Sequence, residues 1–569
     1  MAVDAKDIFR EEKKPWFDFS NLSGDAYGGI VAGIVALPLG LAFGAGVFPH
    51  DPQLGATAGL WGAILVGFFA AAFGGTNTQI SGPTGPMVVV FASLLAGLTA
   101  TLQLTNPDAS NVELIIMAIP LLFAAVVLGG VIQILMGVFK LGKFIKLVPF
   151  TVISGFMSGI GVIIILLQAS RLFGGRPESG QIIDAMKAIP VSIANMNIYA
   201  VGISALTLAI VFFWPKKIGK FLPGTLAALI IGTVVSIIIP GAPLLGEIKA
   251  GIPAFVMPQF TFSTITLVLG AAITLAILGA IDSLLTSMIA DTATRTRHDS
   301  DKELIGQGIG NTIAGFFGAL PGAGATMRTM VNIRTGGTTK LSGMMHGLML
   351  AVIVLVAAPL AAKIPTAVLA GILVKVGFDI IDFDYLKKGL KGPRWDLAVM
   401  VITMFLTVFT DLITAVGAGV FMAAALYIWQ LAGKQTQAVA ESAPSDATEA
   451  EKSIIDAAGG KVMLYDMDSA LSFVTAADLG HYMRKRVAAG VEAVVLDFSR
   501  TGFVDVSAIR AVEAIASDMA TDGKPVYTVG MNPVVKSKIA GLGADKDLSP
   551  SNAFATRIEA LNAASAALA

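Results

Sequence analysis

The sequence lacks cysteine and contains only 4 histidines among its 569 residues. Without cysteine the chain has no disulfide bond, no thiolate metal ligand and no cysteine nucleophile. The histidines do not have the spacing of metal ligands. We also find no nucleophile–base pair and no phosphate-binding loop, so we do not expect an enzyme.

Charge is also scarce. Asp, Glu, Lys and Arg make up 14% of the chain, and 39 basic residues balance 39 acidic ones. A net charge of zero gives no bulk attraction to nucleic acid, so we expect no such partner. Hydrophobic residues, in contrast, make up 55% of the chain, and the mean hydropathy is +0.78. This composition is typical of a protein embedded in a lipid bilayer.

Long apolar segments follow one another over most of the chain. Segments of roughly 18 to 25 apolar residues can cross a bilayer as helices, and we expect about fourteen of them. The third and the tenth are short or interrupted. The segments lie near residues 25–46, 56–74, 84–100, 113–138, 148–170, 196–214, 221–240, 264–289, 303–318, 325–335, 341–362, 365–380, 396–411 and 413–432.

Basic residues follow mainly the even-numbered spans, as Lys140, Lys143 and Lys146 do after span 4. The positive-inside rule therefore places both termini in the cytoplasm. The first 20 residues contain no apolar core of a signal peptide, so we expect a multi-pass protein of the inner (plasma) membrane. The odd-numbered loops are poor in basic residues, with the exceptions Arg171, Arg176, Lys187, Lys249 and Lys363.

Two short motifs interrupt apolar spans: Ser81–Met87 (SGPTGPM) and Pro321–Arg328 (PGAGATMR). An unpaired backbone amide is costly in hydrocarbon, so a broken span survives only where it lines a cavity within the protein. Two breaks at matching places indicate the substrate site of a secondary transporter. Half-helices that start near Thr84 and Ala325 would direct free N–H groups and positive dipole ends at one point, which suits an anion.

Asp282 lies deep in the span 264–289, where an unpaired carboxylate is costly. Thr286 follows at i+4 and shares its helix face. A carboxylate, hydroxyls and the free carbonyls of a broken helix suit a hard coupling cation such as Na⁺. Two alternatives stay open: protonation of Asp282 could couple transport to H⁺, or the carboxylate could form a purely structural pair with Arg328.

The composition changes after Lys434. Residues 435–453 are small, polar and acidic, which is typical of a flexible linker. Beyond them strands alternate with helices, which predicts a small α/β domain with a mainly parallel sheet. We expect strands at 494–498 and 524–529 and helices at 506–520 and 533–542. The expected division is a cytoplasmic segment 1–20, a transmembrane domain 21–434, the linker 435–453 and a cytoplasmic domain 454–569.

A polar stripe runs along the span 303–318. Glu303, Gln307 and Asn311 recur at i, i+4 and i+8 and therefore lie on one helix face. We interpret this stripe as a set of hydrogen bonds to neighbouring helices.

Several motifs, in the same order, resemble those of the SulP (sulfate permease) anion transporters, and the tail resembles their STAS domain. The resemblance implies an all-α membrane domain of two inverted seven-span repeats, with a core domain, a gate domain and an elevator mechanism, in a homodimer. The motifs are ALPLGLAF at 36–43, ISGPTGP at 80–86, TVISGF at 151–156 and ELIGQGIGN at 303–311.

Within this family the chain looks most similar to BicA-type sodium-dependent bicarbonate transporters, through LGAIDSLLTS at 278–287 and GAGATM at 322–327. The similarity implies that Thr84 and Ala325 contact the anion and that Phe43 forms an aromatic wall beside it, although Phe43 could equally be plain core packing. Its implied sodium ligands are Asp282, Thr286, Gly324 and Thr326.

Two residues depart from the BicA-type pattern. Such proteins usually carry Glu where this chain has Gly82, and they lack the arginine that stands here at Arg328. Other SulP members, including sulfate and dicarboxylate carriers, place an arginine there. Arg328 could neutralise the second charge of a divalent substrate, act as a fixed counter-charge, or face the cytosolic exit.

In the tail, Asp497, Asp505 and Ser507 resemble the STAS loop whose serine is phosphorylated in anti-sigma antagonist relatives. Here the text is DVSA at 505–508, not the usual DSSG. We therefore expect a dimerisation and trafficking module, with a regulatory role for Ser507 as the alternative.

The leading expectation is Na⁺-coupled symport of bicarbonate. The alternative is transport of sulfate or a dicarboxylate, coupled to H⁺ or by anion exchange. Rival classes are a nucleobase permease, an uncoupled anion channel and a membrane-anchored signalling scaffold; the STAS tail and Arg328 argue against the first.

Overall fold

The computed structural model describes the chain except residues 1–17, 49, 144–147, 176–181, 220–221, 248–250, 252, 260–263, 393, 411, 439–445, 468–469, 472, 502, 543–547, 549 and 569. Most of the predicted N-terminal segment, part of the predicted linker, and Lys146, Arg176 and Lys249 lie outside the described residues. The chain forms two compact units, Met1–Ala423 and Ala424–Ala569, which we describe one by one.

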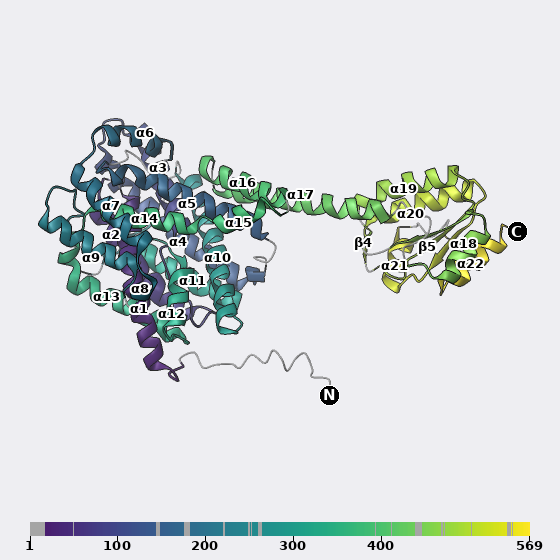
Figure 1. The fold of residues 1–569 in the computed structure, drawn as a ribbon, viewed down its shortest axis with the longest axis horizontal. Coiled ribbons are helices and arrows are strands. Elements are labelled where there is room, and N and C mark those ends of the chain that lie inside the picture. The colour runs from purple at the N-terminus through teal and green to yellow at the C-terminus, as the bar shows by residue number, and fades with distance from the viewer. Residues whose placement is uncertain are drawn as a thin grey trace. The chain divides into compact units, whose positions relative to one another are not determined.

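The first unit is helical apart from two very short strands (Figure 1). Its elements, to the helix that continues into the second unit, are α1 Leu22–Val47, α2 Pro52–Phe73, β1 Ser81–Gly82, α3 Gly85–Thr105, α4 Asn111–Val138, α5 Phe150–Leu172, α6 Ile182–Ala194, α7 Ile198–Phe213, α8 Lys216–Gly219, α9 Gly224–Ile238, α10 Ile265–Thr294, α11 Ser300–Phe316, β2 Ala323–Gly324, α12 Thr326–Arg334, α13 Lys340–Ala361, α14 Thr366–Ile380, α15 Phe383–Gly389, α16 Arg394–Phe409 and α17 Leu412–Ala438.

Six described helices are long and apolar enough to cross a membrane by themselves: α1, α2, α3, α4, α5 and α10. A seventh span results if α6 and α7, which meet at a bend of 115°, count as one. The helix α6 was not expected from the sequence, which indicated a span only from residue 196. Shorter apolar helices include α9, so the expected total of about fourteen spans stays a prediction.

Glycine allows α1 and α2 to pack closely. A Cβ atom on Gly44 would lie 1.9 Å from the carbonyl oxygen of Gly55, and one on Gly59 would lie 2.1 Å from that of Gly40. Small residues at a helix crossing let the backbones approach and gain van der Waals contact where lipid provides no hydrophobic driving force. These contacts hold the two helices that precede the first interrupted motif.

The helices of this unit pack in two groups. The site group consists of α1–α4 and α10–α13, and the flanking group consists of α5, α6, α7, α9, α14 and α16. The two groups meet where α1 packs against α9 and α14, and where α3 packs against α5. The division into core and gate domains is a prediction from resemblance, and it would follow this boundary.

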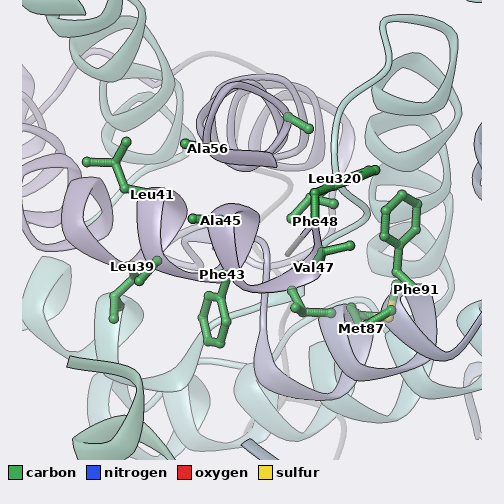
Figure 2. Packing of buried hydrophobic residues seen from close by; sticks show 14 of the residues in the cluster. Leu39, Leu41, Phe43, Ala45, Val47, Phe48, Ala56, Met87, Phe91 and Leu320 are labelled. Carbon is green, nitrogen blue, oxygen red and sulfur yellow. The ribbon is translucent and has the colours of Figure 1, made fainter. Parts of the chain in front are cut away.

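The interior of the unit is filled by aliphatic and aromatic side chains. Figure 2 shows Phe43, Phe48 and Phe91 within this cluster, together with Leu320 from the segment before β2. The rings of Phe48 and Phe91 meet edge to face with centroids 6.3 Å apart, a geometry that aromatic quadrupoles favour. The cluster therefore joins α1, α3 and the second interrupted motif.

The second unit contains a four-stranded sheet in the order β3-β5-β7-β8, with every pair parallel, as the sequence predicted. Alternating side chains of β3 enter different clusters: Met463 packs on one face, and Val462 and Leu464 on the other. The elements are α18 Glu449–Ala457, β3 Val462–Asp466, β4 Ala470–Leu471, α19 Phe473–Ala488, β5 Ala493–Asp497, β6 Phe503–Val504, α20 Val506–Thr521, β7 Val526–Val529, α21 Pro533–Gly541, β8 Ala553–Phe554 and α22 Arg557–Ala566.

The prediction of a flexible linker at 435–453 is wrong at both ends of this range. Helix α17 continues to Ala438, and α18 begins at Glu449. A capping box between Thr448 and Glu451 starts α18 by pairing two backbone N–H groups that a helix start leaves free. The acidic residues Glu449 and Glu451 therefore belong to the first turn of a helix and not to a linker.

Candidate functional site

The two interrupted motifs meet in the structure. Strands β1 and β2 form an antiparallel pair in which Ser81 is opposite Gly324 and Gly82 is opposite Ala323. Helix α3 begins directly after β1, with Thr84 as its N-cap, and α12 begins after β2, with Ala325 as its N-cap. The prediction that these two breaks lie at one place is therefore confirmed in its geometry.

Helix α11 holds this strand pair through the predicted polar stripe. Asn311 makes two hydrogen bonds with the backbone of Gly322: its amide donates to the carbonyl at 3.0 Å and its oxygen accepts from the N–H at 2.8 Å. Gln307 donates to the hydroxyl of Ser81 at 2.6 Å. Asn311 also donates to the side-chain oxygen of Gln133 on α4 at 2.8 Å, so the interpretation of the stripe as hydrogen bonding to a neighbouring helix is confirmed for this residue.

Glu303 completes the stripe and is 2% exposed. Its Oε2 accepts from the N–H groups of Gly75 and Thr76, both at 2.9 Å. Its Oε1 accepts from the amides of Gln79 and Gln307, both at 2.8 Å. A buried carboxylate with four donors is stabilised in place. Glu303 therefore holds the segment before β1 and is not free to bind a ligand.

Three of the four predicted sodium ligands are in direct contact. The hydroxyl of Thr286 donates to the carbonyl of Gly324 at 3.1 Å and lies 2.9 Å from the hydroxyl of Thr326. The N–H of Gly324 donates to Ser283 at 3.0 Å, which fixes β2 against α10. The close approach of α10 to the break between β2 and α12 thus creates a cluster of oxygen atoms.

Asp282 lies one helical turn before Thr286, and its Oδ2 atom is buried without a hydrogen-bond partner. An orphaned carboxylate oxygen one helical turn from a cluster of two hydroxyls and a carbonyl offers the oxygen ligands that a hard cation takes. No ion pair within 4.0 Å joins Asp282 to Arg328 among the residues that the structure describes. The two opposite charges nevertheless interact electrostatically, so a structural role for the pair stays open.

Arg328 instead binds the first motif. Its guanidinium donates from Nη2 to the carbonyl of Pro83 at 2.7 Å, and the side chain is 3% exposed. It passes beside Gly82, where a Cβ atom would lie 2.7 Å from Nη1. Because it is buried, Arg328 does not face an open cytosolic exit, and its positive charge lies at the junction of the two motifs.

The helix starts leave amides for an anion. The first N–H groups of a helix have no acceptor within the helix. In α3 these are the N–H groups of Gly85 and Met87, and in α12 those of Thr326 and Met327. The N–H of Ala325 is already used, because it donates to the carbonyl of Ile80 at 2.8 Å. Any contact of Ala325 with an anion would therefore use another of its atoms.

Thr84 and Phe43 complete the predicted substrate residues. The hydroxyl of Thr84 is buried and has no hydrogen-bond partner in the structure. Phe43 is 4% exposed and belongs to the main hydrophobic cluster. Its place in the cluster agrees with plain core packing, and its role beside an anion stays a prediction.

In the second unit, charged residues gather where β3 and β5 end, and this cluster was missed from the sequence. Arg557 binds Asp497 and Asp466, the last residues of the two strands, and Arg500 binds Asp466. Burial acts to raise the pKa of Asp497, but hydrogen bonds from Ser499 and Arg557 outweigh it, so that the pKa lies below its ordinary value. The sequence signal that could have indicated this cluster is an aspartate at the end of each of two strands that pair in parallel, Asp466 on β3 and Asp497 on β5.

The predicted regulatory loop lies next to this cluster in sequence. Asp505 caps α20 by accepting from the N–H of Ala508 at 2.8 Å. Ser507 is exposed in the first turn of that helix. Exposure makes the hydroxyl accessible, and the role of Ser507 stays a prediction.

Comparison with known proteins places these features in a family. The pattern of the sulfate permease family matches residues 22–403, and that of the STAS domain matches residues 454–560. The chain therefore belongs to the sulfate permease family and has a STAS domain at its C-terminal end. This confirms the resemblance drawn from the motifs and the fold class of a helical membrane domain followed by an α/β domain.

Individual relatives agree with this assignment. The bicarbonate transporter BicA of Synechocystis sp. is 41% identical over 97% of this chain and 95% of its own. The solved transmembrane domain of a cyanobacterial bicarbonate transporter BicA is 46% identical, with a TM-score of 0.65 over 70% of this chain and 98% of that one. Murine Solute Carrier 26 family member A9, in its inward-facing state, shares the fold at 19% identity, with a TM-score of 0.78 over 97% and 92% of the two chains.

Proposed function

We propose that this protein is a secondary active transporter that carries bicarbonate together with Na⁺. The observation that carries the proposal is the oxygen cluster of Thr286, Gly324 and Thr326, together with the orphaned carboxylate oxygen of Asp282 one helical turn before Thr286. The 41% identity to a bicarbonate transporter supports the choice of substrate.

The proposed ion site and anion site share one element. Gly324 and Thr326 flank Ala325, the N-cap of α12, so a cation bound at these oxygens lies next to the helix start that offers amides to the anion. Each bound charge lowers the electrostatic cost of the other. By linkage, Na⁺ then raises the affinity for the anion, and the anion raises the affinity for Na⁺ by the same factor.

The two helix groups support an elevator movement. All the residues proposed to bind Na⁺ or the anion belong to the site group, in the segments from α1 to α4 and from α10 to α13. If this group moves as a body along the flanking group, it carries both ligands between the two sides of the membrane. A homodimer in the plasma membrane, with both termini in the cytoplasm, belongs to the same proposal.

The second candidate substrate is sulfate or a dicarboxylate, with H⁺ coupling or anion exchange. Arg328 is the observation that favours it. A buried guanidinium beside the helix starts can neutralise the second negative charge of a divalent anion. With bicarbonate as the substrate, the same group is a fixed positive charge that makes the site selective for anions.

Uptake into proteoliposomes tests these alternatives. Labelled bicarbonate and sulfate are offered with and without an inward Na⁺ gradient, to the wild type and to Asp282→Asn. Bicarbonate uptake that needs Na⁺ and is lost in the variant supports the proposal. Sulfate uptake that ignores Na⁺ and follows a pH gradient would replace it with the second candidate.

A further inference from the structure

A groove of about 430 Å³ lies between α9 of the flanking group and α1 and α13 of the site group. Leu41, Leu60 and Val354 are buried and line it. Ile230 and Val234 of α9, both 49% exposed, lie at its edge. The groove is therefore concave, apolar and open to the surroundings of the helices.

The lining includes two polar residues, Thr233 and Lys363. The hydroxyl of Thr233 donates to the carbonyl of Leu229 at 2.6 Å, so it is already paired within α9. Lys363 is exposed, and in the described part of the chain no carboxylate lies within ion-pair distance of it. The groove thus combines an apolar surface with one unpaired cation.

The backbone around Lys363 is held in place. Leu245 donates its N–H to the carbonyl of Ile364 at 2.8 Å, and Gly246 donates to that of Ala362 at 3.3 Å. These bonds flank Lys363 on both sides and fix its position beside the groove. The lysine also stands in a loop after an odd-numbered span, where this sequence has few basic residues.

We propose that this groove binds an acyl chain of an anionic phospholipid, whose phosphate pairs with Lys363. The surrounding medium of this unit is a bilayer, so a phospholipid is the amphiphile at hand. An apolar groove with a cation beside it complements a hydrocarbon chain that carries an anionic head. A groove volume of several hundred Å³ is that of a small-molecule site.

The position of the groove predicts a consequence for transport. Since α9 belongs to one helix group and α1 and α13 to the other, a bound lipid contacts both. Occupancy then changes the rate at which the groups move past each other. This consequence rests on the proposed function, whereas lipid binding itself does not.

Binding is tested on the full-length protein by native mass spectrometry, with added phosphatidylglycerol or phosphatidylcholine. Ile237→Trp places a large ring in the groove, and Ile238→Trp makes the same change at the next residue of α9, outside the lining set. Lys363→Ala removes the cation, and Lys187→Ala removes another exposed lysine after an odd-numbered span.

We expect the wild type to retain phosphatidylglycerol in preference to phosphatidylcholine. Lys363→Ala should weaken retention of phosphatidylglycerol about fivefold, the effect of one cation near a lipid surface, and Ile237→Trp should abolish it. The two control variants should bind as the wild type does. Equal retention of both lipids, or binding unchanged by Lys363→Ala or by Ile237→Trp, would overturn the proposal. Absence of anion uptake in every lipid would overturn the proposed function and leave lipid retention as measured.

Discussion

A Cβ atom at position 82 would lie 2.7 Å from Nη1 of Arg328, so the guanidinium occupies the space in which any larger residue would begin its side chain. Gly82 also has φ of 147°, a conformation that residues with a side chain rarely adopt. The two positions therefore form a unit: the absence of a side chain at one makes room for the buried charge of the other. In a chain with glutamate at position 82 and no arginine at position 328, this junction would carry a negative side chain instead of a positive one.

Gly82→Ala should therefore displace the guanidinium of Arg328. If this group binds the anion, loss of a charge-assisted hydrogen bond raises KM for anion uptake by about tenfold or more. Gly270→Ala on α10 is the matched control, since nothing lies within 4 Å of its added Cβ atom. Combining Gly82→Ala with Arg328→Ala separates the causes: if the glycine acts through the arginine, the double variant resembles Arg328→Ala alone. Fully additive effects would contradict the idea of a unit.

Thr286→Val removes one oxygen of the proposed sodium site while it conserves shape. We expect the Na⁺ concentration for half-maximal uptake to rise about tenfold, because a lost polar contact of this kind costs about 1–1.5 kcal/mol. Anion affinity at saturating Na⁺ should change little. Thr292→Val, on the same helix but exposed, removes a hydroxyl that binds only the backbone of Met288 and serves as the control. An unchanged Na⁺ dependence in Thr286→Val would exclude Thr286 as a ligand.

Glu303→Gln should destabilise the membrane domain without a specific effect on ion affinity. The new side-chain amide is a donor, and it would face N–H groups that now donate to the carboxylate. Each donor left without an acceptor costs about 1–3 kcal/mol. The measurement is the melting temperature of the purified protein in detergent, with the exposed Asp108→Asn as the control. A melting temperature equal to that of the wild type would show that the four bonds contribute little.

The STAS domain should lose stability in acid through Asp497. The folded pKa of this group lies below its ordinary value of 3.8, so its contribution is complete above that value and is lost as the pH falls through the folded pKa. Hydrogen exchange of β5 in the full-length protein, measured from pH 6 downward, should show protection falling only below about pH 4. Asp497→Asn should remove this pH dependence; a decline that persists in the variant would assign it to other carboxylates.

Local sequence signals were enough to predict the classes of structure. Long apolar runs indicated membrane helices, and alternating strands and helices after residue 454 indicated the parallel sheet. The recurrence of Glu303, Gln307 and Asn311 at one helix face indicated hydrogen bonds to other helices. Each of these signals depends on spacing within one element, which the sequence states directly. The helical ends of the predicted linker were missed because the small and acidic composition outweighed the one local helix signal, the capping box of Thr448 and Glu451.

The partners of these elements were decided only by the tertiary structure. The sequence placed Gly and Pro in two broken spans and Asp282 four residues before Thr286, and the motif pattern by itself identified the family. It did not show that Gly82 makes room for Arg328, that the N–H of Ala325 is already used, or that Arg557 joins the ends of two strands. Such contacts link residues far apart in the chain, and they depend on how whole helices and strands pack, which no local spacing records.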